Sequence, residues 1–154
     1  MKTIQQILHI KGNDVISIEP DASILDAVRL MMEKNIGALL VMDNDSLVGL
    51  LSERDYVWQM GIDDQCSTTT LVKDIMTPVG ELFCATPEQG VDACMSVVTE
   101  KRVRHLPVVE NNRVLGIISI GDLVKAIIAE QQFVISQMEH YIAGDFPPLL
   151  RQAV

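Results

Sequence analysis

Aromatic residues, cysteines and long apolar runs are all scarce in this chain, and each shortage excludes a class of protein. Aromatic residues make up 4% of the 154 positions while hydrophobic residues make up 48%, so a core has to be built from aliphatic side chains and methionine. The three cysteines, Cys66, Cys84 and Cys94, are odd in number and lack the spacing of a metal site. We therefore expect no metal site, and we expect Cys94, on an apolar helix face, to be a small core residue in a reducing compartment.

Positive charge is also scarce, since the formal net charge is −9. An acidic chain is poorly suited to bind nucleic acid or an anionic membrane surface, so we expect neither partner. No stretch approaches the roughly 18 apolar residues that a membrane-spanning helix needs. Gln5, Gln6 and His9 interrupt the apolar stretch at the N-terminus, which argues against a signal peptide. Together these features predict a cytoplasmic protein.

What the chain does contain is an internal repeat. The stretches Gly49-Leu50-Leu51-Ser52-Glu53-Arg54-Asp55 and Gly116-Ile117-Ile118-Ser119-Ile120-Gly121-Asp122 share one pattern: glycine, two aliphatic residues, serine, two variable residues and aspartate. They begin 67 residues apart, and the same offset aligns Pro20 with Pro87 without a gap from there to the motifs. An ungapped repeat of this length indicates two copies of one supersecondary unit.

Each copy predicts the order strand, helix, strand, strand, helix. After a short helix at 3–8, hydrophobic periodicity and turn residues place the elements of the first copy at 15–18, from 23, at 37–42, at 47–51 and at 52–60, and those of the second at 82–85, 90–101, 104–109, 114–119 and from 123 to about 141. One such unit has too little core to be stable alone. We therefore expect an α/β fold of the α+β kind, in which two repeats pack about a pseudo-twofold axis.

The polar stretch 61–70 is the best candidate for an exposed linker. The expected organisation is a first repeat with the N-terminal helix at 1–65, a linker at 66–78, a second repeat at 79–130 and a C-terminal helical extension at 131–154. The last helix keeps an apolar stripe for about 20 residues, well beyond its counterpart in the first repeat. This stripe either folds back over its own domain or packs against a second chain, and we expect a homodimer.

The chain resembles a pair of cystathionine-β-synthase (CBS) domains over roughly residues 7 to 130. The resemblance rests on the paired motifs, on Asp74-Ile75-Met76-Thr77-Pro78 before the second unit, and on His105-Leu106-Pro107-Val108-Val109. It implies a compact two-repeat module with clefts between the repeats, in which many members bind adenine nucleotides. Members usually regulate an attached enzyme or channel. No such domain is recognisable in this sequence, so the regulated target protein is unknown.

The chemistry of the motif fits a nucleotide but also fits a simpler role. The strand supplies an apolar wall, and the glycine either lets the backbone bend or lets another group approach closely. Ser52 at a helix N-terminus can donate to phosphate, and Asp55 one turn later can accept the ribose hydroxyls. Ser119 and Asp122 can do the same in the second copy. Because Ser-x-x-Asp at a helix start is close to a capping box, both pairs could be helix caps and nothing more.

The resemblance implies composite sites in which the motif of one repeat faces a segment of the other. The first site would consist of Leu50, Ser52, Arg54, Asp55, Met76, Thr77, Val103 and Arg104. The second would consist of Ile117, Ser119, Asp122, Ile36, Gly37 and His105. Basic residues cluster at 101–105, either to hold phosphate or as a solvated patch that offsets local acids. Gly121 stands where the first motif has Arg54, which puts phosphate binding at the second site in more doubt than ribose binding.

Catalysis has little support, because the three histidines lie far apart in sequence and no phosphate-binding glycine loop is present. We expect no catalytic residues, no catalytic cofactor and no enzyme. The function expected is an adenine-nucleotide sensor that binds AMP, or else ADP, ATP or NAD, and changes its conformation or its partners. The alternatives are a constitutive dimerisation or interaction module without a ligand, and a small enzyme with an unrecognised site.

Overall fold

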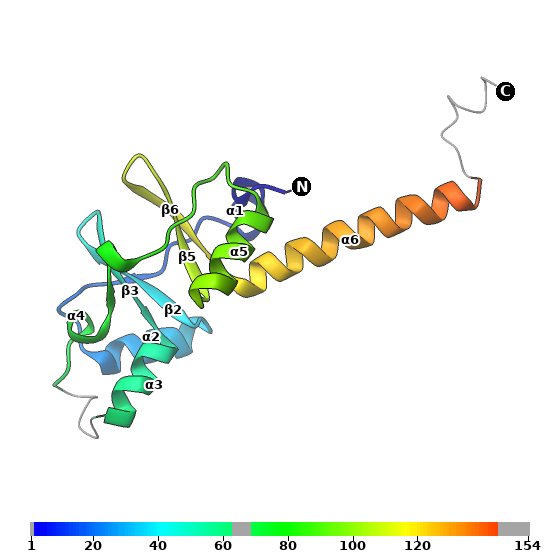
Figure 1. Cartoon of the computed structure of the whole chain (residues 1–154). Helices are drawn as coiled ribbons and strands as arrows, with labels where there is room; N and C mark the ends of the chain where they lie inside the picture. Colours follow the sequence, from blue (N-terminus) through cyan, green and yellow to red (C-terminus); the bar gives the residue numbers. More distant parts are fainter. Residues whose placement is uncertain (1, 63–68, 145–154) are drawn as a thin grey trace.

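The computed structural model describes residues 2–62 and 69–144 and shows an α/β fold made of two tandem repeats (Figure 1). The elements are α1 (Ile4–Lys11), β1 (Ser17–Ile18), α2 (Ile24–Lys34), β2 (Ala38–Asp43), β3 (Ser46–Ser52), α3 (Glu53–Ile62), α4 (Val72–Ile75), β4 (Thr77–Pro78), a 3-10 turn (Val79–Glu81), α5 (Val91–Lys101), β5 (His105–Glu110), β6 (Arg113–Ser119) and α6 (Ile120–Ile142). Most of the linker expected at 61–70 lies outside the described residues.

The two hairpins at the centre of the repeats have the same register. Leu40 of β2 pairs with Leu50 of β3, and Pro107 of β5 pairs with Ile117 of β6. Each hairpin also carries an irregularity at the matching place, after Val41 in β2 and after Val108 in β5. The first hairpin belongs to a four-stranded sheet, β1-β2-β3-β4, whereas β5 and β6 form a sheet of two strands.

The strand expected at 82–85 is wrong, because only Ala85 makes a bridge, to Val108 of β5. Ala85 donates to the carbonyl oxygen of Pro107 at 2.8 Å and accepts from Val109 at 2.9 Å. Extending this parallel pairing beyond Ala85 in either direction would require backbone hydrogen bonds donated by residues 87 and 107. Both residues are proline, which has no N–H group. In the first repeat Leu40 stands at the place of Pro107, and its N–H bonds Ile16, so β1 forms there.

The repeats exchange short segments. Ile4, Ile7 and Leu8 of α1 are buried in the core of the second repeat. Val72 of α4, with Ile75 and Met76 packed against it, belongs to the core of the first repeat. Isolated β-bridges show the same exchange in both directions. Thr3, just before α1, pairs with Gly90 of the second repeat, and Leu71, just before α4, pairs with Ser23 of the first. The N-terminal helix, which precedes the first repeat in sequence, therefore completes the core of the second.

The motif glycines make room for the exchanged segments. A Cβ atom on Gly49 would lie 2.6 Å from Sδ of Met76 and 2.7 Å from the carbonyl oxygen of Thr77. A Cβ atom on Gly116 would lie 2.8 Å from Cδ2 of Leu8. The close approach predicted for these glycines is therefore confirmed, and the approaching groups come from the exchanged segments.

A third apolar cluster joins the two repeats. Ala38, Leu40 and Leu50 of the first hairpin are buried there against Val114 and Ile117 of the second. The two hairpins therefore meet about a pseudo-twofold axis, as expected for units that cannot bury a core alone.

The C-terminal helix α6 begins directly after β6 and projects away from both repeats (Figure 1). Leu123 and Ala126 in its first turns are buried. Four apolar residues later in the stripe remain between 43% and 59% exposed: Ile128, Val134, Ile135 and Met138. The described part of the extension therefore does not fold back over its own domain. None of the helices in the described residues is long and apolar enough to cross a membrane.

Candidate functional site

A cavity of about 790 Å³ lies between the two repeats. The first repeat contributes the end of β3 and the first turns of α3, including Ser52 and Asp55. The second repeat contributes the end of α5, the start of β5 and the segment before α5. The volume falls within the range of small-molecule sites, roughly 300 to 1,000 Å³.

Asp55 and Ser52 form a rigid pair at the start of α3. Oδ2 of Asp55 accepts from the backbone N–H of Ser52 at 2.9 Å and from its hydroxyl at 2.9 Å. The hydroxyl of Ser52 in turn accepts from the N–H of Asp55 at 3.3 Å. These bonds make a helix cap, and the capped residues also line the cavity. Capping therefore fixes the carboxylate at the cavity wall and does not compete with a role in binding.

Four cationic side chains line the same cavity: Arg54, Lys101, Arg102 and Arg104. Arg54 lies over the ring of Trp58 at 5.5 Å and donates to the carbonyl oxygen of Arg102 at 3.0 Å. Lys101 lies over the ring of Phe83 at 5.6 Å. Cation–π contacts with these rings orient Arg54 and Lys101 at the cavity.

Three carboxylates also line the cavity, those of Glu53, Asp55 and Glu81. The four cations outnumber them, so the cavity is a locally positive site in a chain of net charge −9. His105 lies at the same wall with reduced basicity. Burial lowers the pKa of its imidazole, and the charges of Lys11 and Arg104 lower it further, while Asp122 opposes the shift. An anion entering the cavity meets donors from both repeats.

The cavity gathers most residues expected at the first site. Leu50, Ser52, Arg54, Asp55, Thr77, Val103 and Arg104 all line it. Met76 does not, because its sulfur lies against Gly49 and its side chain packs with the first-repeat core. Gly37 and His105, expected at the second site, line this cavity as well.

Sequence reasoning missed the aromatic residues Trp58 and Phe83, which are 64% and 41% exposed. One signal was available for Trp58. It follows Arg54 by four residues, and this spacing places the two side chains on one face of α3. No periodic sequence pattern could have indicated the position of Phe83, because the segment before α5 forms no strand.

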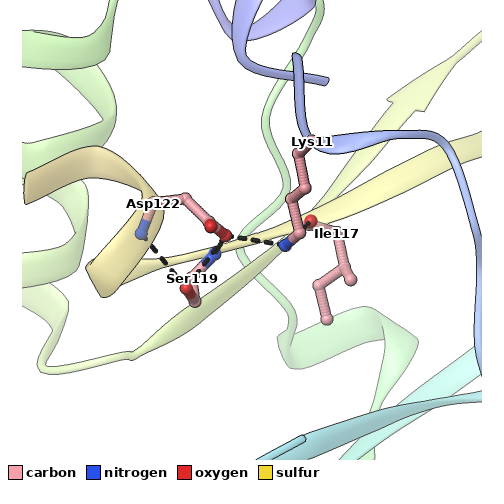
Figure 2. A network of polar contacts seen from close by, with 4 residues as sticks. All are labelled: Lys11, Ile117, Ser119 and Asp122. Carbon is pink, nitrogen blue, oxygen red and sulfur yellow. Dashed lines mark hydrogen bonds and ion pairs between the residues drawn. The ribbon is translucent and has the colours of Figure 1, made fainter. Parts of the chain in front are cut away.

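The second motif repeats the cap but holds an additional cation. Oδ2 of Asp122 accepts from the N–H of Ser119 at 2.7 Å and from its hydroxyl at 2.9 Å. Nζ of Lys11 donates to the same Oδ2 at 2.7 Å and to the carbonyl oxygen of Ile117 at 2.9 Å (Figure 2). Burial alone would raise the pKa of the Asp122 carboxyl, but the bonds from Lys11 and Ser119 outweigh it and lower the pKa.

The structure thus brings together Ile117, Ser119 and Asp122, as expected for the second site, and adds Lys11, which was not expected there. Ile36, assigned to the same site, packs against the first-repeat core. The repeat alignment contained no signal for Lys11, because it begins at Pro20 and does not include the N-terminal helix.

In the described ranges 2–62 and 69–144, no group of three His, Cys, Asp or Glu side chains is placed to hold a metal ion. Cys94 is buried in the second-repeat core, as expected, and burial raises the pKa of its thiol. Cys84 is exposed, and Cys66 lies outside the described residues.

Comparison with known proteins identifies the repeats. The family model described as CBS domain matches residues 8–59 and 72–129. The CBS domain-containing protein CBSX3 of Arabidopsis thaliana, a mitochondrial protein, is 33% identical over 151 residues, covering 94% of this chain and 73% of its own length. The crystal structure of the CBS domain protein NE2398 is 44% identical with a TM-score of 0.78, covering 83% of this chain and 99% of its own. The fold alone is shared with CBSX2, solved in complex with AMP, at 23% identity and a TM-score of 0.69, covering 84% and 98% of the two chains.

Proposed function

This chain belongs to the CBS domain family, and from that premise we propose that it is a regulatory module that binds an adenine nucleotide in the cavity between its repeats. One observation carries the proposal. The cavity places the Ser52–Asp55 pair of one repeat opposite a cationic wall from the other. A nucleotide has the matching parts, a diol that donates to a carboxylate and a phosphate that accepts from cations.

The residues take separate roles in this proposal. Asp55 accepts the ribose hydroxyls with the carboxylate that Ser52 holds in place. Arg54, Arg102 and Arg104 donate to the phosphate, and apolar Leu50 and Val103 contact the base. AMP is the first ligand to test because CBSX2, which shares the fold, was solved with AMP. ADP, ATP and NAD carry the same adenosine group and form the rest of the panel.

Thermal unfolding with AMP, ADP, ATP and NAD tests the proposal. A ligand at about 100 times its dissociation constant adds about 2.7 kcal/mol to the free energy of unfolding. For a chain of this size that corresponds to a rise of roughly 5–10 °C in Tm. Mass spectrometry of small molecules released from the purified protein would identify a ligand that stays bound. An unchanged Tm with all four nucleotides, and no released ligand, would contradict the proposal.

A matched pair of variants separates binding from capping. Asp55→Asn removes the ribose acceptor, whereas Asp45→Asn removes the same charge in the exposed turn between β2 and β3. We expect Asp55→Asn to weaken AMP binding at least about tenfold, the effect of losing a charge-assisted hydrogen bond, and Asp45→Asn to leave it unchanged. Equal AMP affinity in both variants, with a stability loss only in Asp55→Asn, would favour a purely structural cap.

A homodimer is the proposed assembly. The exposed apolar stripe of α6, which includes Ile128, Val134, Ile135 and Met138, has no partner among the described residues of the chain. A second copy would cover it, and a nucleotide that favours one arrangement of the dimer would shift the population towards it. The same stripe supports the second candidate function, a constitutive dimerisation module without a ligand. The target protein, the absence of enzymatic activity and the cytoplasmic location stay predictions.

A further inference from the structure

Lys11 distinguishes the two Ser–Asp pairs, which are otherwise equivalent. Its ammonium group contacts both Oδ2 of Asp122, at 2.7 Å, and the carbonyl oxygen of Ile117, at 2.9 Å (Figure 2). Within the part of the chain that the structure describes, Asp55 forms its hydrogen bonds with Ser52 and has no ion pair. We infer that Lys11 is an internal occupant of the second site, which keeps that site closed and limits the protein to one nucleotide per chain. The inference rests on the proposed function.

One carboxylate oxygen of Asp122 is already fully engaged, and one of its three donors is a cation. Oδ2 of Asp122 accepts from the N–H of Ser119, from its hydroxyl and from Lys11, at 2.7, 2.9 and 2.7 Å. A carboxylate oxygen offers about two acceptor positions, so three donors leave none free on Oδ2, and the ammonium group also neutralises the charge of the carboxylate. A ribose that bound Asp122 in the way proposed for Asp55 would compete with this ammonium group, and displacing it would leave Lys11 without its two acceptors. The same approach to Asp55 displaces no cation.

Lys11 is positioned by a helix whose apolar face is buried. It is the last residue of α1, whose Ile4, Ile7 and Leu8 lie in the core of the second repeat. Leu8 sits over Gly116, the first residue of the second motif, so the helix cannot shift without disturbing that core. The side chains of Lys11 and Asp122 are 37% and 18% exposed, so water screens this ion pair less than a surface pair. A ligand at this site therefore competes with a pre-positioned cation.

The first site has no equivalent occupant. Leu8 and Met76 approach the two motif glycines in the same way, so the position that matches Lys11, three residues later, is Val79, whose side chain carries no donor. The neighbouring Thr77 lines the open cavity. The exchange of segments between repeats therefore places a lysine in one site and leaves the other accessible. Both caps are built alike, so Lys11 is the difference at the Ser–Asp pairs themselves, in addition to Gly121 in place of Arg54 within the motif.

The test compares Lys11→Met with Lys73→Met. Methionine keeps most of the aliphatic stem and removes the ammonium group. Lys73 pairs with Asp21 at 2.8 Å, and neither residue lines the cavity, so its loss changes the net charge equally. The number of AMP molecules bound per chain is measured by equilibrium dialysis and by calorimetry. We expect one AMP for wild type and for Lys73→Met, and two for Lys11→Met, with the second site at least about tenfold tighter than in wild type.

Two further variants assign the additional site. In the Lys11→Met background, Asp122→Asn should return the number to one, and Asp55→Asn should leave one AMP at the newly opened site. Two AMP molecules on wild type, or equal numbers on wild type and Lys11→Met, would overturn the inference. No AMP on wild type but one on Lys11→Met would contradict the proposed function for the first site and support the closure of the second. No AMP on either protein would overturn both.

Discussion

Nη1 of Arg54 donates to the backbone carbonyl oxygen of Arg102 across 3.0 Å, and this bond joins the two repeats at the cavity wall. Arg102 ends α5 in the left-handed region, with φ at 54°. The matching residue at the end of α2 is Asn35, with φ at 52°, and asparagine tolerates this conformation better than arginine does. The second repeat therefore places a cation at a position where a smaller residue would be more stable, and such strain is often found at functional sites.

Arg102→Asn should raise stability and lower nucleotide affinity. Relief of the left-handed arginine should add about 0.5–1 kcal/mol to the free energy of unfolding. Loss of one phosphate donor should weaken AMP binding about tenfold. Denaturant unfolding and calorimetry measure the two effects. Arg113→Gln, on an exposed position of β6, is the control for the lost charge and should change neither quantity. Unchanged AMP affinity in Arg102→Asn would remove this residue from the site.

Alanine at the two motif glycines should have unequal costs. A Cβ on Gly49 would lie 2.7 Å from the carbonyl oxygen of Thr77, a backbone atom that cannot move without moving β4. A Cβ on Gly116 would meet Cδ2 of Leu8, the end of a flexible side chain. We expect Gly49→Ala to lower the free energy of unfolding by about 2–3 kcal/mol and Gly116→Ala by about 1 kcal/mol or less. Denaturant unfolding of the two variants compares them directly, and equal losses would contradict the explanation.

Much of the fold could be predicted from the sequence because both copies of the repeat show the same pattern of strands and helices. Hydrophobic periodicity and turn residues, read in both copies, placed both hairpins, and the helix that follows each hairpin, within a few residues of their observed bounds. The exchange of α1 and α4 between repeats did not follow, because sequence order assigns α1 to the repeat that it precedes. The strand at 82–85 was wrong because apolar content alone ignores the N–H groups that Pro87 and Pro107 lack.

The site was less predictable than the fold. The Ser–Asp pairs were visible as motifs, but the same spacing describes a helix cap, and only the packing of the repeats places Asp55 at a cavity. Lys11 lies 111 residues before Asp122, so their contact depends on how the exchanged helix packs. Met76 was misplaced for a related reason. Its side chain fills the space above Gly49, which the motif leaves empty.

His105 should make the protein sensitive to mild acid. Burial and the charges of Lys11 and Arg104 lower the pKa of its imidazole in the folded state below the unfolded value of about 6.5, although Asp122 opposes this. Below that value the unfolded chain binds the proton more readily, so stability should fall as the pH decreases from about 6.5 towards the folded pKa. Denaturant unfolding between pH 7.5 and 5.5 measures the loss, which His105→Asn should reduce. His9→Asn, at an exposed position of α1, is the control and should retain the wild-type slope.

The exposed stripe of α6 predicts a dimer that one charge can break. Ile135 is 54% exposed in the middle of the stripe, and Ala129 lies on the opposite face of the helix. Burying an unpaired carboxylate in a dimer interface is costly, so Ile135→Glu should weaken association at least about a hundredfold, whereas Ala129→Glu should not. Light scattering at micromolar concentration should give about twice 17.0 kDa for wild type and Ala129→Glu, and close to 17.0 kDa for Ile135→Glu. A wild-type mass near 17.0 kDa, with and without AMP, would exclude the homodimer.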